Sequence, residues 1–233
     1  MKFCPGYSVS ARAFAALLLT TAMPAAAAAE MRPTLNFYGV TGLIDMPSAG
    51  MQPDGDLSIS VSNFGPTTRG TLTFQILPRL QGSFRYSGVR DLALGGFGPG
   101  ETYFDRSFDV RFRLLDEGRW WPAVAIGLQD FIGTGTFAGE YVVATKTFGD
   151  RVKVTGGLGW GRLGSYGSFA TVGNRPGPGV ATGGTPNLGQ WFRGPVAPFG
   201  GVEWQVNDRL GLKVEYSSDA YVLEDGQGLF KRR

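Results

Sequence analysis

The stretch Arg209–Ser217, RLGLKVEYS, alternates apolar and polar side chains along its length. Leucine, valine and tyrosine stand at its even-numbered positions, and all of its charged residues stand at odd-numbered ones. Because successive side chains of a β-strand point to opposite faces, this stretch would have one apolar and one charged face. Residues 104–114 and 151–160 repeat the alternation. The sequence therefore predicts a protein built from amphipathic strands.

The N-terminus predicts export from the cytoplasm. Lys2 and Arg12 precede a short apolar run at residues 13–22, and the alanines that follow offer A-x-A cleavage sites. Residues 1–29 are therefore expected to be a cleaved signal peptide. Cys4 is the only cysteine and would leave with it, so the mature chain is expected to form no disulfide.

Composition narrows the class of protein further. Without Lys2 and Arg12, the 22 basic residues fall to 20 against 19 acidic ones, and a net charge of +1 predicts no nucleic-acid partner. The 37 glycines and 17 phenylalanines exceed ordinary usage, which suits tight turns and aromatics at a membrane rim. No stretch after residue 29 is apolar enough for a transmembrane helix, so a helical inner-membrane protein is excluded.

The alternation predicts about nine strands, each near the roughly 9–11 residues that a tilted membrane strand needs. They are expected at 56–64, 71–77, 80–87, 104–115, 121–130, 138–148, 151–161, 196–206 and 209–217. Short turns alternate with longer loops, the asymmetry of tight periplasmic turns and long external loops. The longer loops are expected at 65–70, 88–103, 131–137 and 162–195.

These features predict an all-β, antiparallel, up-and-down transmembrane β-barrel of the outer membrane. A soluble β-sandwich also alternates, but the signal peptide, the loop asymmetry and the aromatic-rich apolar face together favour the barrel. Bacterial barrels have an even number of strands, so nine strands in residues 56–217 predict an incomplete barrel. The polar tail at 218–233 is the expected truncation point; closure by oligomerisation or by the N-terminal segment is the alternative. That segment, residues 30–55, is expected to plug the lumen or to add an edge strand.

Several longer motifs resemble one family in the same order along the chain. They are Asn36–Ala49 (NFYGVTGLIDMPSA), Thr73–Arg79 (TFQILPR), Asp105–Asp109 (DRSFD), Leu114–Pro122 (LLDEGRWWP) and Gly139–Lys146 (GEYVVATK). Together they resemble the YjbH family of outer-membrane exopolysaccharide proteins, from about residue 35 to about residue 219. The resemblance implies an outer-membrane β-barrel tied to production or export of extracellular polysaccharide. Members of that family are far longer, and the resemblance supplies no catalytic residue.

The sequence offers little catalytic chemistry. It contains no histidine, which removes Ser–His–Asp and Cys–His machinery and histidine-based zinc sites. No P-loop or EF-hand spacing occurs. We therefore expect no metal, no cofactor and a non-enzymatic role.

Charged residues on the polar strand faces are the candidate functional residues. They are expected to face the lumen and to contact a hydroxylated polymer, or to pair with one another as structural groups. They are Arg85, Asp105, Asp109, Arg111, Arg113, Glu140, Lys146, Lys153, Glu203, Lys213 and Glu215. A pair of these carboxylates acting on glycan is a further alternative. Trp191, in the long external loop, is the candidate for stacking on a sugar, or it pins the loop to the rim.

The sequence thus predicts an outer-membrane protein with a non-enzymatic role in exopolysaccharide production or export. Its expected partners are outer-membrane lipid, the exopolysaccharide and other proteins of the export system. A general porin-like channel is the first alternative, and a barrel enzyme acting on glycan is the second.

Overall fold

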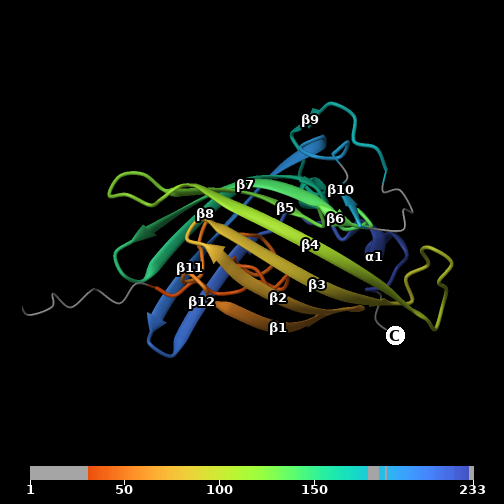
Figure 1. Ribbon diagram of the computed structural model, residues 1–233, viewed down its shortest axis with the longest axis horizontal. Coiled ribbons are helices and arrows are strands. Elements are labelled where there is room, and N and C mark those ends of the chain that lie inside the picture. Colours follow the sequence, from red (N-terminus) through yellow and green to blue (C-terminus); the bar gives the residue numbers. More distant parts are fainter. Residues whose placement is uncertain (1–30, 178–183, 187, 231–233) are drawn as a thin grey trace, which may run out of the picture. The chain divides into compact units, whose positions relative to one another are not determined.

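The computed structural model describes residues 31–177, 184–186 and 188–230, so the expected signal peptide at 1–29 lies outside the described residues. The fold is a ten-stranded antiparallel sheet in which neighbours in sequence are mostly neighbours in space (Figure 1). In sheet order its main strands are β1 (Leu57–Phe64), β2 (Thr67–Leu77), β3 (Leu80–Arg90), β4 (Thr102–Leu115), β5 (Ala123–Gln129), β7 (Gly139–Phe148), β8 (Val152–Gly161), β11 (Gly194–Asn207) and β12 (Leu210–Tyr216).

The remaining elements are short. Strand β9 (Ala170–Val172) pairs with the start of β11, while β6 (Ile132–Gly133) and β10 (Thr185–Pro186) pair with each other. The 3₁₀-helix η1 (Arg162–Gly164) follows β8, and helix α1 (Val222–Gly226) follows β12. Within the described part of the chain, no helix is long and apolar enough to cross a membrane.

The all-β, antiparallel prediction is confirmed, and each of the nine expected strands is present. The sheet is open, as the count of nine strands predicts: among the described residues, β1 and β12 end the sheet order and do not pair with each other. The expected loop at 65–70 is also wrong, because β1 and β2 are joined by a two-residue turn with Phe64 opposite Thr67. The first residues of β2 face inward, where Thr67, Arg69 and Thr71 are buried polar groups. The outward positions between them are Thr68 and Gly70, which are not apolar, so the start of β2 has no apolar alternation to detect.

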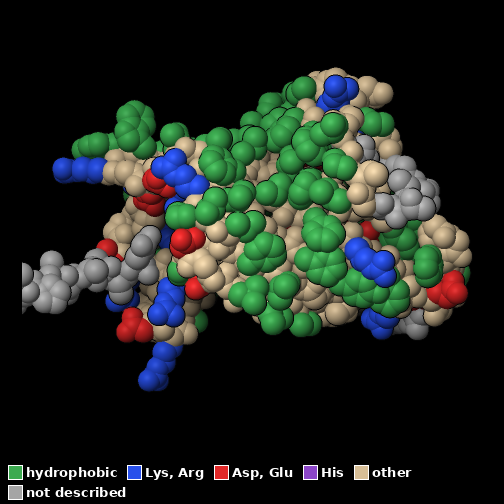
Figure 2. Space-filling model, viewed as in Figure 1, with side chains coloured by type: hydrophobic (Ala, Val, Ile, Leu, Met, Phe, Trp, Pro, Cys, Tyr) green, Lys and Arg blue, Asp and Glu red, His purple; other side chains and the backbone are tan. Residues whose placement is uncertain are grey.

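The outer face of the sheet is apolar. Cross-strand partners share a face, so Phe84 opposite Phe108 and Val202 opposite Val154 mark the outer side. Figure 2 shows hydrophobic side chains over the middle of the strands and charged ones gathered toward the strand ends. Exposed members of this face include Ile59, Leu72, Phe74, Phe104, Phe108, Phe112, Val154, Trp204, Leu212 and Val214.

The inner face is covered by the N-terminal segment, residues 31–52, which in Figure 1 runs between strands from both ends of the sheet order. Its apolar residues Leu43, Met46 and Ala49 are fully buried. A fully buried Leu or Met contributes roughly 1.5–3 kcal/mol to folding, so this packing anchors the segment to the sheet. The strands supply the facing apolar residues Ala123, Ala125, Tyr141, Val143 and Phe199, and Leu163 of η1 completes the cluster.

Candidate functional site

The N-terminal segment is bound by side chains from one end of the sheet. On β12, Lys213 Nζ donates to the carbonyls of Gly42 and Leu43, both at 2.7 Å. The Glu215 carboxylate accepts the backbone N–H groups of residues 44, 45 and 46 at 2.8, 3.0 and 2.9 Å. Bonds to charged groups are among the stronger ones in proteins, so β12 holds this backbone turn firmly.

The other end of the sheet binds the same segment. Ser62 of β1 donates to the carbonyl of residue 37 at 2.6 Å, and Thr71 and Thr73 of β2 donate to the carbonyls of residues 38 and 39. Gly39 fits closely here: its φ is 78°, and an added Cβ would lie 2.4 Å from Ser60 Oγ and from Thr71 Cβ. The segment therefore bridges β1 and β12, the strands that do not pair directly.

Two buried arginines dominate the centre of the inner face. Arg111 donates to the carbonyls of Thr41 at 2.9 Å and of Gly50 at 2.7 Å, and also to that of Ser48. Arg85 forms a bidentate ion pair with Asp109, at 2.6 and 3.1 Å. Since breaking a buried ion pair by removing one partner costs about 3–5 kcal/mol, the Arg85–Asp109 pair stabilises the fold.

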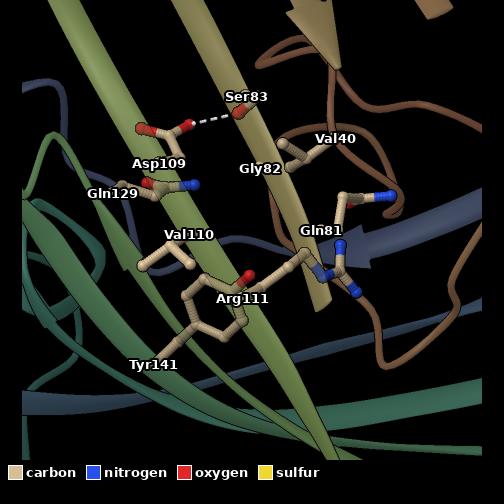
Figure 3. Close-up of a pocket in the computed structure, with 9 residues that line it drawn as sticks. All are labelled: Val40, Gln81, Gly82, Ser83, Asp109, Val110, Arg111, Gln129 and Tyr141. Carbon is tan, nitrogen blue, oxygen red and sulfur yellow. Dashed lines mark hydrogen bonds between the residues drawn. The ribbon is translucent and has the colours of Figure 1, made fainter. Parts of the chain in front are cut away.

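Beside these arginines the inner face retains little free space. A cavity of about 10 Å³ lies among Gln81, Asp109, Arg111, Gln129 and Tyr141 (Figure 3). That volume is about the minimum that holds one water molecule. Tyr38, Leu43, Arg85 and Tyr141, on the two sides of this interior, are each 2% exposed or less. The space between the N-terminal segment and the central strands is therefore packed.

The register places most of the candidate residues on the inner face. These are Arg85, Asp105, Asp109, Arg111, Arg113, Lys153, Glu203, Lys213 and Glu215. The bonds described above engage Arg85, Asp109, Arg111, Lys213 and Glu215 within the protein.

Glu140 and Lys146 require a correction, because they lie on the outer face and not in the lumen. Glu140 stands opposite Leu128 and Trp160, and Lys146 stands opposite Val154. Both faces of β7 carry apolar residues, because Tyr141 and Val143 pack inward on the N-terminal segment. The alternation of β7 therefore gave no reliable inward side. Glu140 is covered by the long loop and pairs with Arg175 at 2.6 Å, and Lys146 pairs with Glu117 at 2.8 Å.

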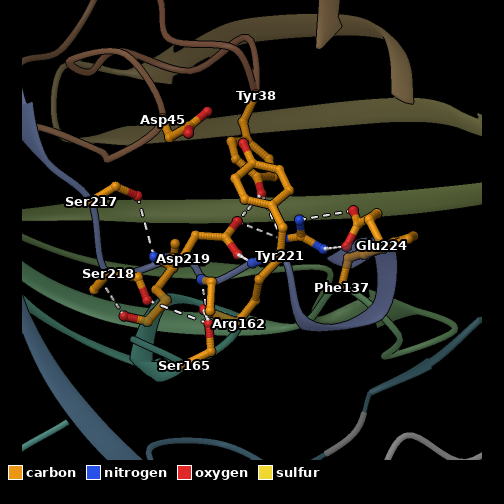
Figure 4. Close-up of polar contacts among 12 residues, drawn as sticks. Tyr38, Asp45, Phe137, Arg162, Ser165, Ser217, Ser218, Asp219, Tyr221 and Glu224 are labelled. Carbon is orange, nitrogen blue, oxygen red and sulfur yellow. Dashed lines mark hydrogen bonds and ion pairs between the residues drawn. The ribbon is translucent and has the colours of Figure 1, made fainter. Parts of the chain in front are cut away.

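A second polar network joins the segments before and after the sheet (Figure 4). It lies at the end of the sheet where β8 ends and the long loop begins, here called the loop end. Arg162 of η1 donates to Asp219 at 2.7 Å, to Glu224 at 2.9 Å and to the Tyr38 hydroxyl at 2.8 Å. Burial raises the pKa of the neighbouring Asp45 to about 6. Sequence reasoning missed this network, because Arg162 opens a loop and both acidic partners lie in the tail.

Three aspartates cluster where β4 meets the loop after β5. The Asp130 N–H donates to Asp109 at 2.8 Å, and Asp130 Oδ2 accepts from the Phe137 N–H at 3.2 Å. Burial, followed by the nearby Asp105 carboxylate, raises the pKa of Asp130 to about 8. No group of three or more acidic side chains in the described residues is arranged to hold a metal ion.

Trp191 packs within the protein. Its ring meets Phe131 edge-on at a centroid distance of 6.4 Å, and the adjacent Phe192 meets Trp160 at 5.3 Å. Trp191 is half-buried. These contacts hold the long loop against β8 and against the start of the loop after β5. Such packing agrees with the alternative in which Trp191 pins the loop.

The chain matches known proteins along most of its length. The family model described as "Exopolysaccharide biosynthesis protein YbjH", of the family YjbH, matches residues 34–233. An "Uncharacterized lipoprotein YjbH" of Escherichia coli strain K12 is 34% identical over 210 residues, which are 83% of this chain and 29% of the relative. The chain therefore spans less than a third of that relative's length. No solved structure matches the chain significantly.

Proposed function

This chain belongs to the YjbH family of exopolysaccharide biosynthesis proteins, and we propose that it serves exopolysaccharide export as a non-enzymatic protein of the outer membrane. The observation that carries the proposal is the division of the sheet into an exposed apolar outer face and a packed inner face. Its export-system partners and the polymer would meet the protein at the strand ends, where the loops and charged groups lie.

Contact with lipid explains the outer face. Strands β2, β3, β4, β7, β8 and β11 have 10–14 residues, enough for the roughly 9–11 that a tilted strand needs to cross a bilayer. Soluble monomers rarely expose a contiguous apolar patch larger than a few hundred Å². The relative's description as a lipoprotein favours a place in the cell envelope for this chain too.

The two alternatives, a porin-like channel and a barrel enzyme acting on glycan, have less support. A porin needs a water-filled lumen, whereas the N-terminal segment fills the space beside the central strands. A glycan hydrolase needs two carboxyl groups free to act on the bond, whereas Asp109 and Glu215 are engaged by Arg85 and by backbone N–H groups.

The test is complementation of a deletion strain, with the secreted polysaccharide measured. The wild-type gene should restore secretion, and Phe108→Arg should not, because an arginine at mid-membrane on a lipid-facing strand costs about 2–4 kcal/mol. Phe169→Arg, at a 66% exposed loop position, is the matched control and should restore secretion. Full secretion by Phe108→Arg, with the protein folded in the aqueous periplasmic fraction, would contradict the proposal.

A further inference from the structure

A cavity of about 340 Å³ opens at the loop end of the sheet. Its walls come from the loop before β7, from η1, from the long loop and from α1. Thr136, Arg162, Arg175, Gln190, Val222 and Leu223 are among its lining residues. Small-molecule sites commonly measure about 300–1,000 Å³, so this cavity has room for a ligand of one or two sugar units.

The two cations at this cavity are already neutralised. Arg162 pairs with Asp219 and Glu224. Arg175 pairs with both oxygens of Glu140, at 2.6 and 3.0 Å. Because three buried carboxylates balance two guanidinium groups, the walls carry no surplus positive charge to attract an anionic ligand.

Gln190 supplies a side-chain oxygen that lacks a hydrogen-bond donor among the described residues. Its side chain is 1% exposed, and its Nε2 donates to the carbonyls of Pro176 at 3.3 Å and Gly177 at 3.4 Å. Its Oε1 accepts no hydrogen bond from the described residues. A buried acceptor left in this way costs about 1–3 kcal/mol. A ligand hydroxyl can donate to it, whereas an ionised carboxylate or phosphate can only accept.

The remaining walls are apolar. Ala138, Pro176, Pro195, Val222 and Leu223 line the cavity with hydrocarbon. Binding sites for small ligands typically combine such walls with a few placed polar groups. The C–H faces of a sugar ring suit these walls, while its hydroxyls suit Gln190 and Thr136.

We propose that this cavity binds one or two uncharged sugar units of the exopolysaccharide. The inference rests on the proposed function, because that function brings a polysaccharide to the loop end. It adds a binding site on this chain, and the chemical class of sugar that the site accepts.

The experiment is calorimetric titration of the full chain in detergent micelles. The probes are fragments of two to four sugars, cut from the exopolysaccharide of the native strain and separated by anion exchange into uncharged and acidic pools. The uncharged pool should bind and the acidic pool should bind at least about tenfold more weakly. Binding by the acidic pool alone, or by neither pool, overturns the proposal.

Variants locate the site. Val222→Trp narrows the cavity from an exposed position on α1 and should abolish binding. Gln190→Met removes the free acceptor together with the Nε2 bonds to the carbonyls of Pro176 and Gly177, and should weaken binding at least about tenfold. Asp225→Trp, exposed on the same helix but away from the cavity, should bind as wild type. Equal binding by Val222→Trp and Asp225→Trp would overturn the assignment. If Phe108→Arg blocks secretion while no fragment binds, the cavity proposal fails and the proposed function stands.

Discussion

Lys213 and Glu215, two residues apart on the inner face of β12, hold the same backbone turn through groups of opposite polarity. Lys213 donates to two of its carbonyls, and Glu215 accepts three of its N–H groups. The turn also has its own bond, from the Leu43 N–H to the carbonyl of residue 46 at 2.8 Å. Strand β12, which ends the sheet order among the described strands, is thus joined to the interior.

Glu215→Ala should weaken this attachment. Three backbone N–H groups lose a charged acceptor, and hydrogen bonds to charged groups contribute about 1.5–3 kcal/mol. We expect the free energy of unfolding to fall by about 2–4 kcal/mol, measured by urea titration in detergent. Asp150→Ala, at an exposed turn, is the control and should change it by less than about 0.5 kcal/mol. Equal stability of the two variants would show that the Glu215 hydrogen bonds do not stabilise the fold.

Two glycines with the same backbone conformation separate strain from packing. Gly39 and Gly55 have φ values of 78° and 77°. A Cβ added at Gly39 would meet Ser60 and Thr71, whereas a Cβ added at Gly55 would have no atom within 4 Å. Both alanine variants share the cost of a positive φ. Overpacking should lower the stability of Gly39→Ala by a further 1–3 kcal/mol or so. An equal loss of stability in the two variants, measured by thermal unfolding, would mean that the N-terminal segment is not packed as described.

The Arg85–Asp109 pair should show strong coupling. Arg85→Met leaves a buried carboxylate unpaired and should cost about 3–5 kcal/mol. Adding Asp109→Asn removes that charge, so the double variant should recover at least about 1 kcal/mol. Chemical unfolding of the four proteins in a double-mutant cycle measures the coupling. Additive losses would contradict a direct pair.

Asp130 should make stability depend on pH. Its pKa is about 8 in the folded protein against 3.8 ordinarily, so the folded state binds the proton more tightly. The resulting stabilisation is fully present below pH 3.8 and is lost as pH rises through about 8. Asp130→Asn removes the titrating group, and asparagine tolerates its φ of 51°.

The asparagine variant should therefore melt at a higher temperature than wild type at pH 8, with a smaller difference at pH 5. Asp54→Asn, at an exposed position, should follow wild type at both values. A melting temperature for Asp130→Asn that falls with pH as steeply as that of wild type would rule out Asp130 as the group responsible.

The strands were predictable because one face is apolar and the other polar along most of them, as in β4 and β12. The alternation does not identify the inward side where the inner face also carries apolar residues. In β7, Tyr141 and Val143 pack against the N-terminal segment, so the prediction that Glu140 and Lys146 face inward is wrong.

The network around Arg162 could not be predicted from local pattern. Its partner Asp219 is 57 residues away, and Tyr38 is 124 residues away. Lys213 meets the carbonyl of Leu43 across 170 residues. Such contacts depend on how the sheet curves around the segment, and no local alternation encodes that.

Cysteine accessibility tests the central proposal, that the outer face lies in lipid, most directly. In a Cys4→Ser background, which has no other cysteine, Phe108→Cys and Phe169→Cys would be treated with a water-soluble maleimide in intact outer membranes. We predict labelling of the cysteine at 169 and protection of the cysteine at 108, because the reactive thiolate forms only where water reaches the thiol. Equal labelling of both positions in folded protein would contradict the account.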